Sequence, residues 1–295
     1  MSNFISKFLM GQWNVGIIEK SVEDIVRKRE SYEIRWMKHH YADRFFADPF
    51  LWKTDESFYY IFAEEMPFYC NIGYISLLKI RRKDMKLVEK QKIISDDSHF
   101  SYPNPVGEWI IPENFRSGKC EAYRFDGEKI KEKKLIMAQG LIDQTFLTYG
   151  GKEWIFATDE DNKLCGLKIY YRGAGSNESW KEHTRNPVSE DIYTARPGGH
   201  FFKIGDKLYR PGQDSKIRYG HKIHIMEVTE LTETNYAEKE VCILDAEGQG
   251  RYHMGLHTFN AEDGFIVVDG FREYHSWFVK PMCLKFPNIM KRLEK

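Results

Sequence analysis

Short apolar runs bounded by glycine, asparagine, aspartate and proline recur along this chain, and most occur as pairs joined by a tight turn. One pair runs from Ala47 to Glu65, where "ADPFLW" is followed after a polar turn by "FYYIFAEE". Two later pairs turn at Gly150-Gly151 and at Asp263-Gly264, which are dipeptides typical of β-hairpins. A helical pattern stands out only at Ser21–Ser31, with Ser21 as N-cap. The pattern predicts an all-β fold with one short N-terminal helix.

The hairpin pairs repeat with a period of roughly 50 residues, which is typical of repeat architectures with several strands per unit. Each pair starts with a polar residue that precedes an apolar strand, and these lead residues are separated by 54, 41, 53 and 61 residues. The five lead residues are Asp48, Tyr102, Asp143, Arg196 and His257. This spacing predicts a five-bladed β-propeller that forms a single domain over residues 1–295.

The segments between the hairpins supply the remaining strands of each blade. We expect third strands at 73–83, 120–128, 166–173, 220–228 and 277–286, and outer strands at 87–95, 133–138, 180–188 and 239–244. The fifth blade lacks an outer strand of its own. The spare strand "YEIRWMKHH" at 32–40 would close the ring by joining that blade, which removes exposed strand edges.

In a propeller the inner strands start at one face around the central axis, so the five lead residues should meet there. The ends of the second strands should return to the same rim. They would add Glu64 or Glu65, Glu113, Asp159, Arg210 with Gln213 and Asp214, and Asp269, while His99 would approach from a loop between blades. A concave site with convergent carboxylates, arginines and aromatic walls is a default candidate for ligand binding.

Each of these residues also has a structural interpretation. An aspartate before a proline, such as Asp48, often only satisfies backbone N–H groups at the start of a strand. Arg196 could be an ion-pair partner of Asp48 or Asp143, and Glu113 and Asp159 could be ordinary rim residues. His253 and His257 have a four-residue spacing that suits a metal only on a helix, and their neighbours favour a loop, so we expect no metal site.

Composition narrows the possible partners. Lys plus Arg equals Asp plus Glu at 44 each, which gives no electrostatic case for nucleic acid or for an anionic membrane as the main partner. No apolar run is long enough to span a membrane, and no signal peptide is evident. The five cysteines are odd in number and widely spaced, which indicates reduced thiols in a cytoplasmic protein. We expect no cofactor.

The motifs "WNVGI", "ADPFL", "YYIFAEE", "HFSYP", "IIPEN", "IDQTF", "ARPGG" and "LYRPGQD" occur in an order that resembles one family. That family is the N-terminal domain of plant glucosamine inositolphosphorylceramide transferases and its stand-alone bacterial relatives, and the resemblance runs from Trp13 to about Asp269. In the plant proteins a separate glycosyltransferase domain follows. It has no counterpart in these residues, so the resemblance alone does not carry over the activity.

The resemblance also implies a fold similar to five-bladed glycosidases of the arabinanase and invertase type. Asp48 matches their catalytic aspartate on the first inner strand, and Asp143 is similar to a further inner-strand aspartate. Their general acid, a glutamate leading a later inner strand, is missing here, and Glu113 or Glu65 would have to replace it. Glycoside hydrolysis generally needs two carboxyl groups.

We therefore expect a carbohydrate-active enzyme that transfers a glycosyl or related group in surface-glycan or glycolipid synthesis. Asp48 would be the base, Asp143 would orient the sugar or tune Asp48, and Tyr102 would stack on a ring. Arg196, Arg210 and His99 would neutralise an anionic leaving group, as in a sugar phosphate or nucleotide sugar. The alternatives are a glycoside hydrolase with a displaced acid, and a glycan-binding scaffold beside a separate transferase.

Overall fold

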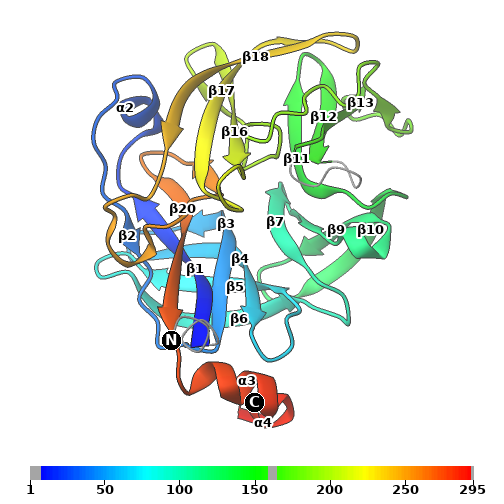
Figure 1. Cartoon of the computed structure of the whole chain (residues 1–295). Coiled ribbons are helices and arrows are strands. Elements are labelled where there is room, and N and C mark those ends of the chain that lie inside the picture. The colour runs from blue at the N-terminus through cyan, green and yellow to red at the C-terminus, as the bar shows by residue number, and fades with distance from the viewer. Residues whose placement is uncertain (1–7, 159–164, 294–295) are drawn as a thin grey trace.

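The computed structural model describes residues 8–158 and 165–293 and shows five antiparallel sheets arranged around a centre, as in a five-bladed β-propeller (Figure 1). Blade one contains β3 (Arg44–Thr54), β4 (Phe58–Pro67), β5 (Tyr74–Arg81) and β6 (Lys86–Ile94). Blade two contains β7 (Ser101–Val106), β8 (Trp109–Glu113), β9 (Cys120–Phe125) and β10 (Ile130–Met137). Blade three contains β11 (Ile142–Tyr149), β12 (Lys152–Thr158), β13 (Leu167–Gly173) and β14 (Lys181–Glu182).

Blade four contains β15 (Phe202–Ile204), β16 (Lys207–Asp214), β17 (Lys222–Leu231) and β18 (Tyr236–Leu244). Blade five combines both ends of the chain: β19 (Phe259–Ala261), β20 (Ile266–His275), β1 (Leu9–Ile18) and β2 (Arg35–Trp36). Short 3₁₀ turns lie at Phe115–Ser117 and Gly250–Tyr252. The predicted all-β, five-bladed architecture is confirmed.

Closure of the ring by the N-terminal part of the chain is also confirmed, but through a different strand. β1 pairs with β20 over ten residues and is the third strand of blade five, whereas residues 32–40 contribute only the two-residue outer strand β2. The prediction of a third strand at 277–286 is wrong, because this segment forms helix α3 (Val279–Lys285). Pro281 cannot donate to a strand ladder but is tolerated in the first turn of a helix.

Three helices complete the described chain: α2 (Val22–Val26), α3 and α4 (Pro287–Leu293). α2 is the predicted N-terminal helix, and the Ser21 side chain accepts a hydrogen bond from the Asp24 N–H as its N-cap. α3 and α4 follow β20 and lie outside the ring of blades (Figure 1). The described residues contain no helix that is both long and apolar enough to cross a bilayer.

The hydrophobic core lies between neighbouring sheets, because each blade buries both faces against the next. Phe62 on blade one, for example, packs with Phe100 and with Tyr123 and Phe125 of blade two. Val15 of β1 and Val267 of β20 share a cluster with blade-one residues such as Ile61, which fastens the closing blade to the first. This packing fixes the five inner strands around the centre, where the polar lead residues gather.

Candidate functional site

Three of the five predicted lead residues lie in irregularities of inner strands, Tyr102 and Asp143 at the second residue and Asp48 at the fifth. The strand ladders shift register between Ala47 and Phe50, between Ser101 and Asn104, and between Ile142 and Thr145. Asp48, Tyr102 and Asp143 lie inside these shifts with φ angles of 49°, 43° and 49°. Left-handed backbone at non-glycine residues costs free energy and is concentrated at functional sites. Its recurrence in three blades makes these irregularities the first place to look for chemistry.

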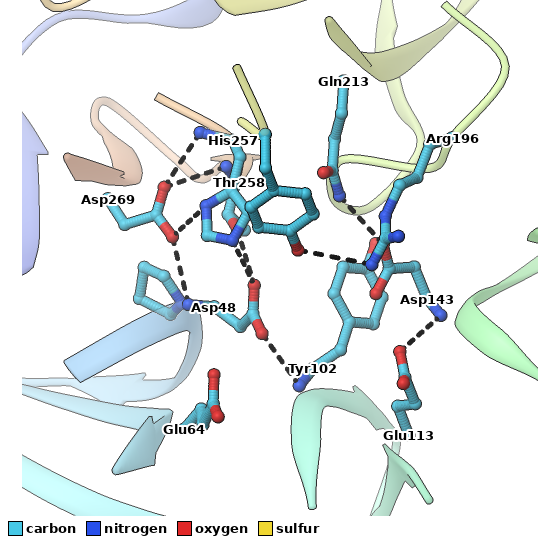
Figure 2. A network of polar contacts seen from close by, with 12 residues as sticks. Asp48, Glu64, Tyr102, Glu113, Asp143, Arg196, Gln213, His257, Thr258 and Asp269 are labelled. Carbon is cyan, nitrogen blue, oxygen red and sulfur yellow. Dashed lines mark hydrogen bonds and ion pairs between the residues drawn. The ribbon is translucent and has the colours of Figure 1, made fainter. Parts of the chain in front are cut away.

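The structure brings all five lead residues together, the returning second strands add four more side chains, and Thr258 joins them next to His257. We call the following residues the central cluster: Asp48, Glu64, Tyr102, Glu113, Asp143, Arg196, Gln213, His257, Thr258 and Asp269 (Figure 2). All are buried except the half-buried Glu113. Glu64 and Glu113 lie opposite Ala47 and Ser101 in the ladders, so the prediction that second-strand ends return to the rim is confirmed.

Asp48 is both hydrogen-bonded and ion-paired. Its Oδ2 accepts from the Tyr102 N–H at 3.2 Å, and its Oδ1 accepts from the Thr258 hydroxyl at 3.1 Å. His257 Nε2 lies 3.3 Å from Asp48 Oδ1, while His257 Nδ1 lies 2.7 Å from Asp269 Oδ2. The second contact is a close ion pair that is not aligned as a hydrogen bond. Asp269 in turn accepts hydrogen bonds from the backbone N–H groups of His257, Thr258 and Asp48.

These contacts determine the pKa values of Asp48 and His257. Burial raises the pKa of Asp48 to about 6, with His257 opposing the rise and Asp143 and Asp269 adding to it. Burial alone would lower the pKa of His257, but the carboxylates of Asp269 and Asp48 outweigh it, so the pKa is raised. The cluster therefore pairs an Asp48 carboxyl with a pKa of about 6 with an imidazole whose charged form is favoured by two neighbouring carboxyl groups.

Asp143 is the centre of a second group. Its Oδ2 accepts from Arg196 Nε at 2.5 Å and from Gln213 Nε2 at 2.9 Å, and its own N–H donates to Glu113 Oε2 at 3.0 Å. The Arg196 guanidinium also donates to the Tyr219 hydroxyl at 3.3 Å and lies 5.0 Å from the centre of that ring. Tyr219 is 44% exposed, so it is the open edge of an otherwise buried group.

The two glutamates of the cluster favour their neutral form. Burial raises the pKa of Glu64 well above its usual value, and the charges of Asp48 and Glu113 raise it further. Burial likewise raises the pKa of Glu113, with Asp143 adding to the rise and Arg196 opposing it. Separate environments thus push the carboxyl pKa values apart, which is how a protein obtains an acid and a base at one pH.

His99 lies at the edge of this group. Its Nδ1 accepts from the Gly73 N–H at 2.9 Å, which places the proton of the neutral ring on Nε2. Nε2 lies 3.3 Å from Glu64 Oε1. Burial lowers the pKa of His99, so the ring is neutral at physiological pH and does not form a charged pair with Glu64.

A second group of polar residues lies two to four positions beyond the lead residues in the sequence. His200 Nε2 contacts Asn104 Oδ1 at 2.7 Å, and Asn260 donates to the Pro49 carbonyl at 2.8 Å. The Tyr102 hydroxyl contacts Thr145 Oγ1 at 2.8 Å in this group. Tyr102 is fully buried, so the expectation that its ring stacks on a sugar is not supported by its position.

Asp48, His257 and Asp269 are a possible metal-ligand group, since one ligand atom from each lies within 4.8 Å of the others. A histidine ligand must be neutral. His257 has a raised pKa and contacts a carboxylate through each ring nitrogen. The three residues are therefore better suited to holding a proton on His257 than to binding a metal ion. The His253 and His257 pair does not form a site, because His253 is exposed and contacts the Gly250 carbonyl.

Several predicted site residues lie elsewhere. Glu65 faces away from the centre and binds Arg44, Lys90 and Ser76. Arg210 is fully buried against Glu238 of the outer strand β18, so it cannot neutralise a leaving group. Asp214 lies 3.5 Å from His221 and 3.8 Å from His224 on blade four. Asp159 lies outside the described residues.

These errors have one cause. Adjacent strand residues point to opposite faces, so a shift of one position exchanges the central side chain for a structural one. Glu64 and Gln213 are central while Glu65 and Asp214 are not. Whether Glu64 or Glu65 faces the centre depends on the register between β3 and β4, which shifts at Asp48. The only sequence signal for this shift is the proline that follows Asp48. Thr258 and Tyr219 were missed because neither is at the lead position of a repeat. The catalytic and binding roles of the cluster stay predictions.

Fold and cluster together define a class: a five-bladed β-propeller with a buried, acid-rich polar cluster where its inner strands begin. Residues 35–261 match the family described as "Glucosamine inositolphosphorylceramide transferase 1, N-terminal", and the chain belongs to this family. The matched range includes all of the central cluster except Asp269, and it excludes β1.

Curated relatives are similar over the same region. Glucosamine inositolphosphorylceramide transferase 1 of Arabidopsis thaliana is 28% identical over 249 residues, which are 77% of this chain and 32% of the relative. The protein of the same name from Oryza sativa subsp. japonica is 30% identical over 256 residues, which are 79% of this chain and 34% of the relative. The chain thus spans about a third of the length of the curated relatives it matches.

Solved structures with related folds include glycoside hydrolases. A family 117 glycoside hydrolase from Zobellia galactanivorans is 11% identical with a TM-score of 0.48, covering 90% of this chain and 91% of its own. A GH43_1 enzyme from Xanthomonas citri is 10% identical with a TM-score of 0.49, covering 78% and 87%. Both TM-scores are below 0.5, so the five-bladed architecture rests on the strand pairing itself.

Proposed function

We propose that this protein is a carbohydrate-active enzyme that transfers a glycosyl group from a phosphate-linked or nucleotide-linked sugar, in the synthesis of a surface glycan or glycolipid. The observation that carries the proposal is the central cluster, where the carboxyl groups of Asp48, Glu64 and Glu113, all with raised pKa values, lie together with the cationic Arg196. The names of the plant relatives support a transferase, although the chain matches only a third of their length.

In this mechanism each part of the cluster has one task. Asp48 takes the proton of the acceptor hydroxyl as its oxygen forms a bond to the anomeric carbon. The bond from that carbon to the phosphate oxygen breaks, and the leaving phosphate keeps the electron pair. Arg196 stabilises the developing charge. Tyr219 offers the exposed ring against which a sugar can stack, in place of the buried Tyr102.

The neutral glutamates and the location complete the proposal. Glu113 is half-buried beside Arg196 and Asp143, where it can donate a proton to the leaving group. Asp143 orients the Arg196 guanidinium through a hydrogen bond, and His257 orients the Asp48 carboxyl group through an ion pair. We place the protein in the cytoplasm, where its five free cysteines would stay reduced. Its substrate class is a sugar phosphate or nucleotide sugar, and a separate glycan-assembly enzyme is a natural partner.

The test is turnover of a panel of nucleotide sugars and sugar phosphates, followed as release of the phosphate-bearing product. Asp48→Asn should lower kcat by about 10²–10⁴-fold while the melting temperature stays within a few degrees. Asp206→Asn, an exposed turn aspartate, is the matched control and should keep full activity. Full activity in Asp48→Asn, or ligand binding without turnover that this change leaves unaffected, would exclude the mechanism.

The pH dependence adds an independent readout. Asp48 must lose its proton to act as a base, so turnover should rise as the pH increases through about 6. It should fall again at higher pH, where the neutral glutamates lose their protons. A flat profile below pH 7 would contradict the role of Asp48.

A glycoside hydrolase is the second candidate, and one observation favours it. Glu64 and Glu113 have raised pKa values, so in this candidate function either one would act as the general acid that is missing from the usual position in the sequence. Release of free sugar from a glycan or aryl glycoside, with no nucleotide sugar present, would select the hydrolase over the transferase.

A further inference from the structure

The two C-terminal helices expose a concentration of large apolar side chains. Phe278 is 74% exposed and Leu284 is 70% exposed. Together they are part of a surface that we call the C-terminal apolar face, which consists of Trp277, Phe278, Leu284, Phe286 and Ile289. Five of the fourteen exposed large apolar residues in the described chain thus fall within thirteen consecutive positions. An exposed patch of this kind marks an interaction surface more often than chance.

The same segment is strongly cationic, although the whole chain has no net charge. Residues 276–293 contain Lys280, Lys285, Lys291 and Arg292 and no aspartate or glutamate. Lys285 and Lys291 are exposed, and in the sequence they lie within two residues of members of the apolar face. The segment therefore combines aromatic and aliphatic residues with positive charge, which is the composition of helices that lie in a membrane interface.

Among the described residues, the contacts that fix these helices to the propeller leave all five side chains of this face exposed to solvent in part. The Ser276 N–H donates to the Phe8 carbonyl at 2.9 Å, and Lys280 Nζ donates to the Leu9 carbonyl at 2.7 Å. Cys283 is buried, while the neighbouring Leu284 points outward. The Phe8 ring lies 4.4 Å from the Trp277 ring. α3 and α4 lie outside the ring of blades (Figure 1), and their exposed apolar side chains are therefore not enclosed by the blades.

We propose that the C-terminal apolar face docks the protein on a membrane that contains anionic lipid. Its aromatic and aliphatic side chains would enter the headgroup region, and Lys285 and Lys291 would contact lipid phosphates. A second copy of the chain fits less well, because both copies would bring the same positive charges to the interface. The inference does not depend on the proposed transfer reaction.

Binding is measured by co-sedimentation with phosphatidylcholine vesicles, either pure or with about a third phosphatidylglycerol, as an anionic surface. We expect binding to the anionic vesicles, weaker binding to the neutral ones, and weakening with salt. Ile289→Glu should lower the partition coefficient about tenfold or more. Ile243→Glu is its matched control: Ile243 is 49% exposed on β18 and Ile289 is 48% exposed, so the control should bind as the wild type does.

Charge is tested separately. Lys285→Gln with Lys291→Gln should lower binding to anionic vesicles about 25-fold, at about fivefold per lysine, and leave binding to neutral vesicles unchanged. Lys119→Gln with Lys134→Gln, two exposed lysines on blade two, is the control pair. Melting temperatures of all variants establish that each is folded.

Three results would overturn the proposal: no binding of the wild type to either vesicle, equal losses in the control variants, or a dimer in solution that Ile289→Glu dissociates without any vesicle binding. The last result would assign the face to a second copy of the chain.

Discussion

Asp48, Tyr102 and Asp143 adopt a backbone conformation that costs free energy, and all three do so within a register shift of an inner strand. Each such residue costs about 1–3 kcal/mol and persists only where the surrounding structure enforces it. Aspartate tolerates left-handed backbone better than tyrosine does. Here the left-handed backbone is stabilised by hydrogen bonds, because the Tyr102 N–H donates to Asp48 and the Asp143 N–H donates to Glu113. The strain is thus part of how the carboxyl groups are held.

Glu64 and Glu65 are adjacent residues with opposite environments, and they should respond differently to the same substitution. Burial would raise the pKa of Glu65, but Lys90, Arg44 and Ser76 outweigh it and lower the pKa. Glu65→Gln removes the buried carboxylate that Lys90 and Arg44 share, while Arg44 keeps its pair with Asp43, so the free energy of unfolding should fall by about 3 kcal/mol. Glu64→Gln replaces a neutral carboxyl by a neutral amide, so stability at neutral pH should not fall, whereas turnover should.

The sign of the pH dependence checks this assignment. The folded-state pKa of Glu64 is raised above its unfolded value, so its contribution to stability is complete below about pH 4.5 and is lost as the pH rises toward the folded pKa. Glu64→Gln removes that loss, and its stability relative to the wild type should increase with pH in urea denaturation. A variant that becomes relatively less stable at higher pH would show that Glu64 is ionised in the folded protein.

Most individual strands could be predicted from the sequence, because hairpins with tight turns are local features. The first and second strands of all five blades, and four of the five third strands, were assigned in this way. β1 was missed because "LMGQWNVGII" contains two glycines and no hairpin partner nearby, and its partner β20 lies more than 240 residues away. Its role depends on ring closure, which is a long-range property.

The start of blade four shows how one element is shaped by its neighbour. Gly199 has a φ of 140°, and a Cβ there would lie 2.1 Å from the Phe259 carbonyl oxygen of β19. The neighbouring Gly198 carbonyl accepts from the Phe259 N–H at 2.7 Å. The "ARPGG" segment is therefore held against blade five, and this places Arg196 in the central cluster.

Gly199→Ala should lower the free energy of unfolding by about 3 kcal/mol or more, since the backbone must move in two blades. Gly205→Ala is the matched control. Gly205 also has a positive φ, 62°, but a Cβ there would meet nothing within 4 Å, so the cost should be about 1 kcal/mol. Urea denaturation compares the two. Equal costs would mean that backbone conformation alone, and not contact with blade five, requires glycine at 199.

At the scale of the whole molecule, the two ends of the chain have different tasks. β1 lies between β20 and β2, buries Val15 and Ile17, and stacks Trp13 on His257 at 4.0 Å. The N-terminal strand thus both closes the ring and supports the cluster. The strands are complete at His275, and the helices that follow add no strand to the described sheets. Propeller stability should therefore depend on the first segment and much less on the last.

Two truncations test this asymmetry. Removal of residues 1–18 exposes the edge of β20 and opens the core between blades five and one, so the cooperative thermal transition should be lost and aggregation should increase. Removal of residues 276–295 should lower the melting temperature by only a few degrees and retain the far-ultraviolet circular dichroism of the strands. The same C-terminal truncation should abolish vesicle binding while turnover in solution persists, because the central cluster is untouched. Loss of cooperative unfolding in the C-terminal truncation would show instead that α3 and α4 are part of the folding unit, and their apolar face would then need a structural explanation.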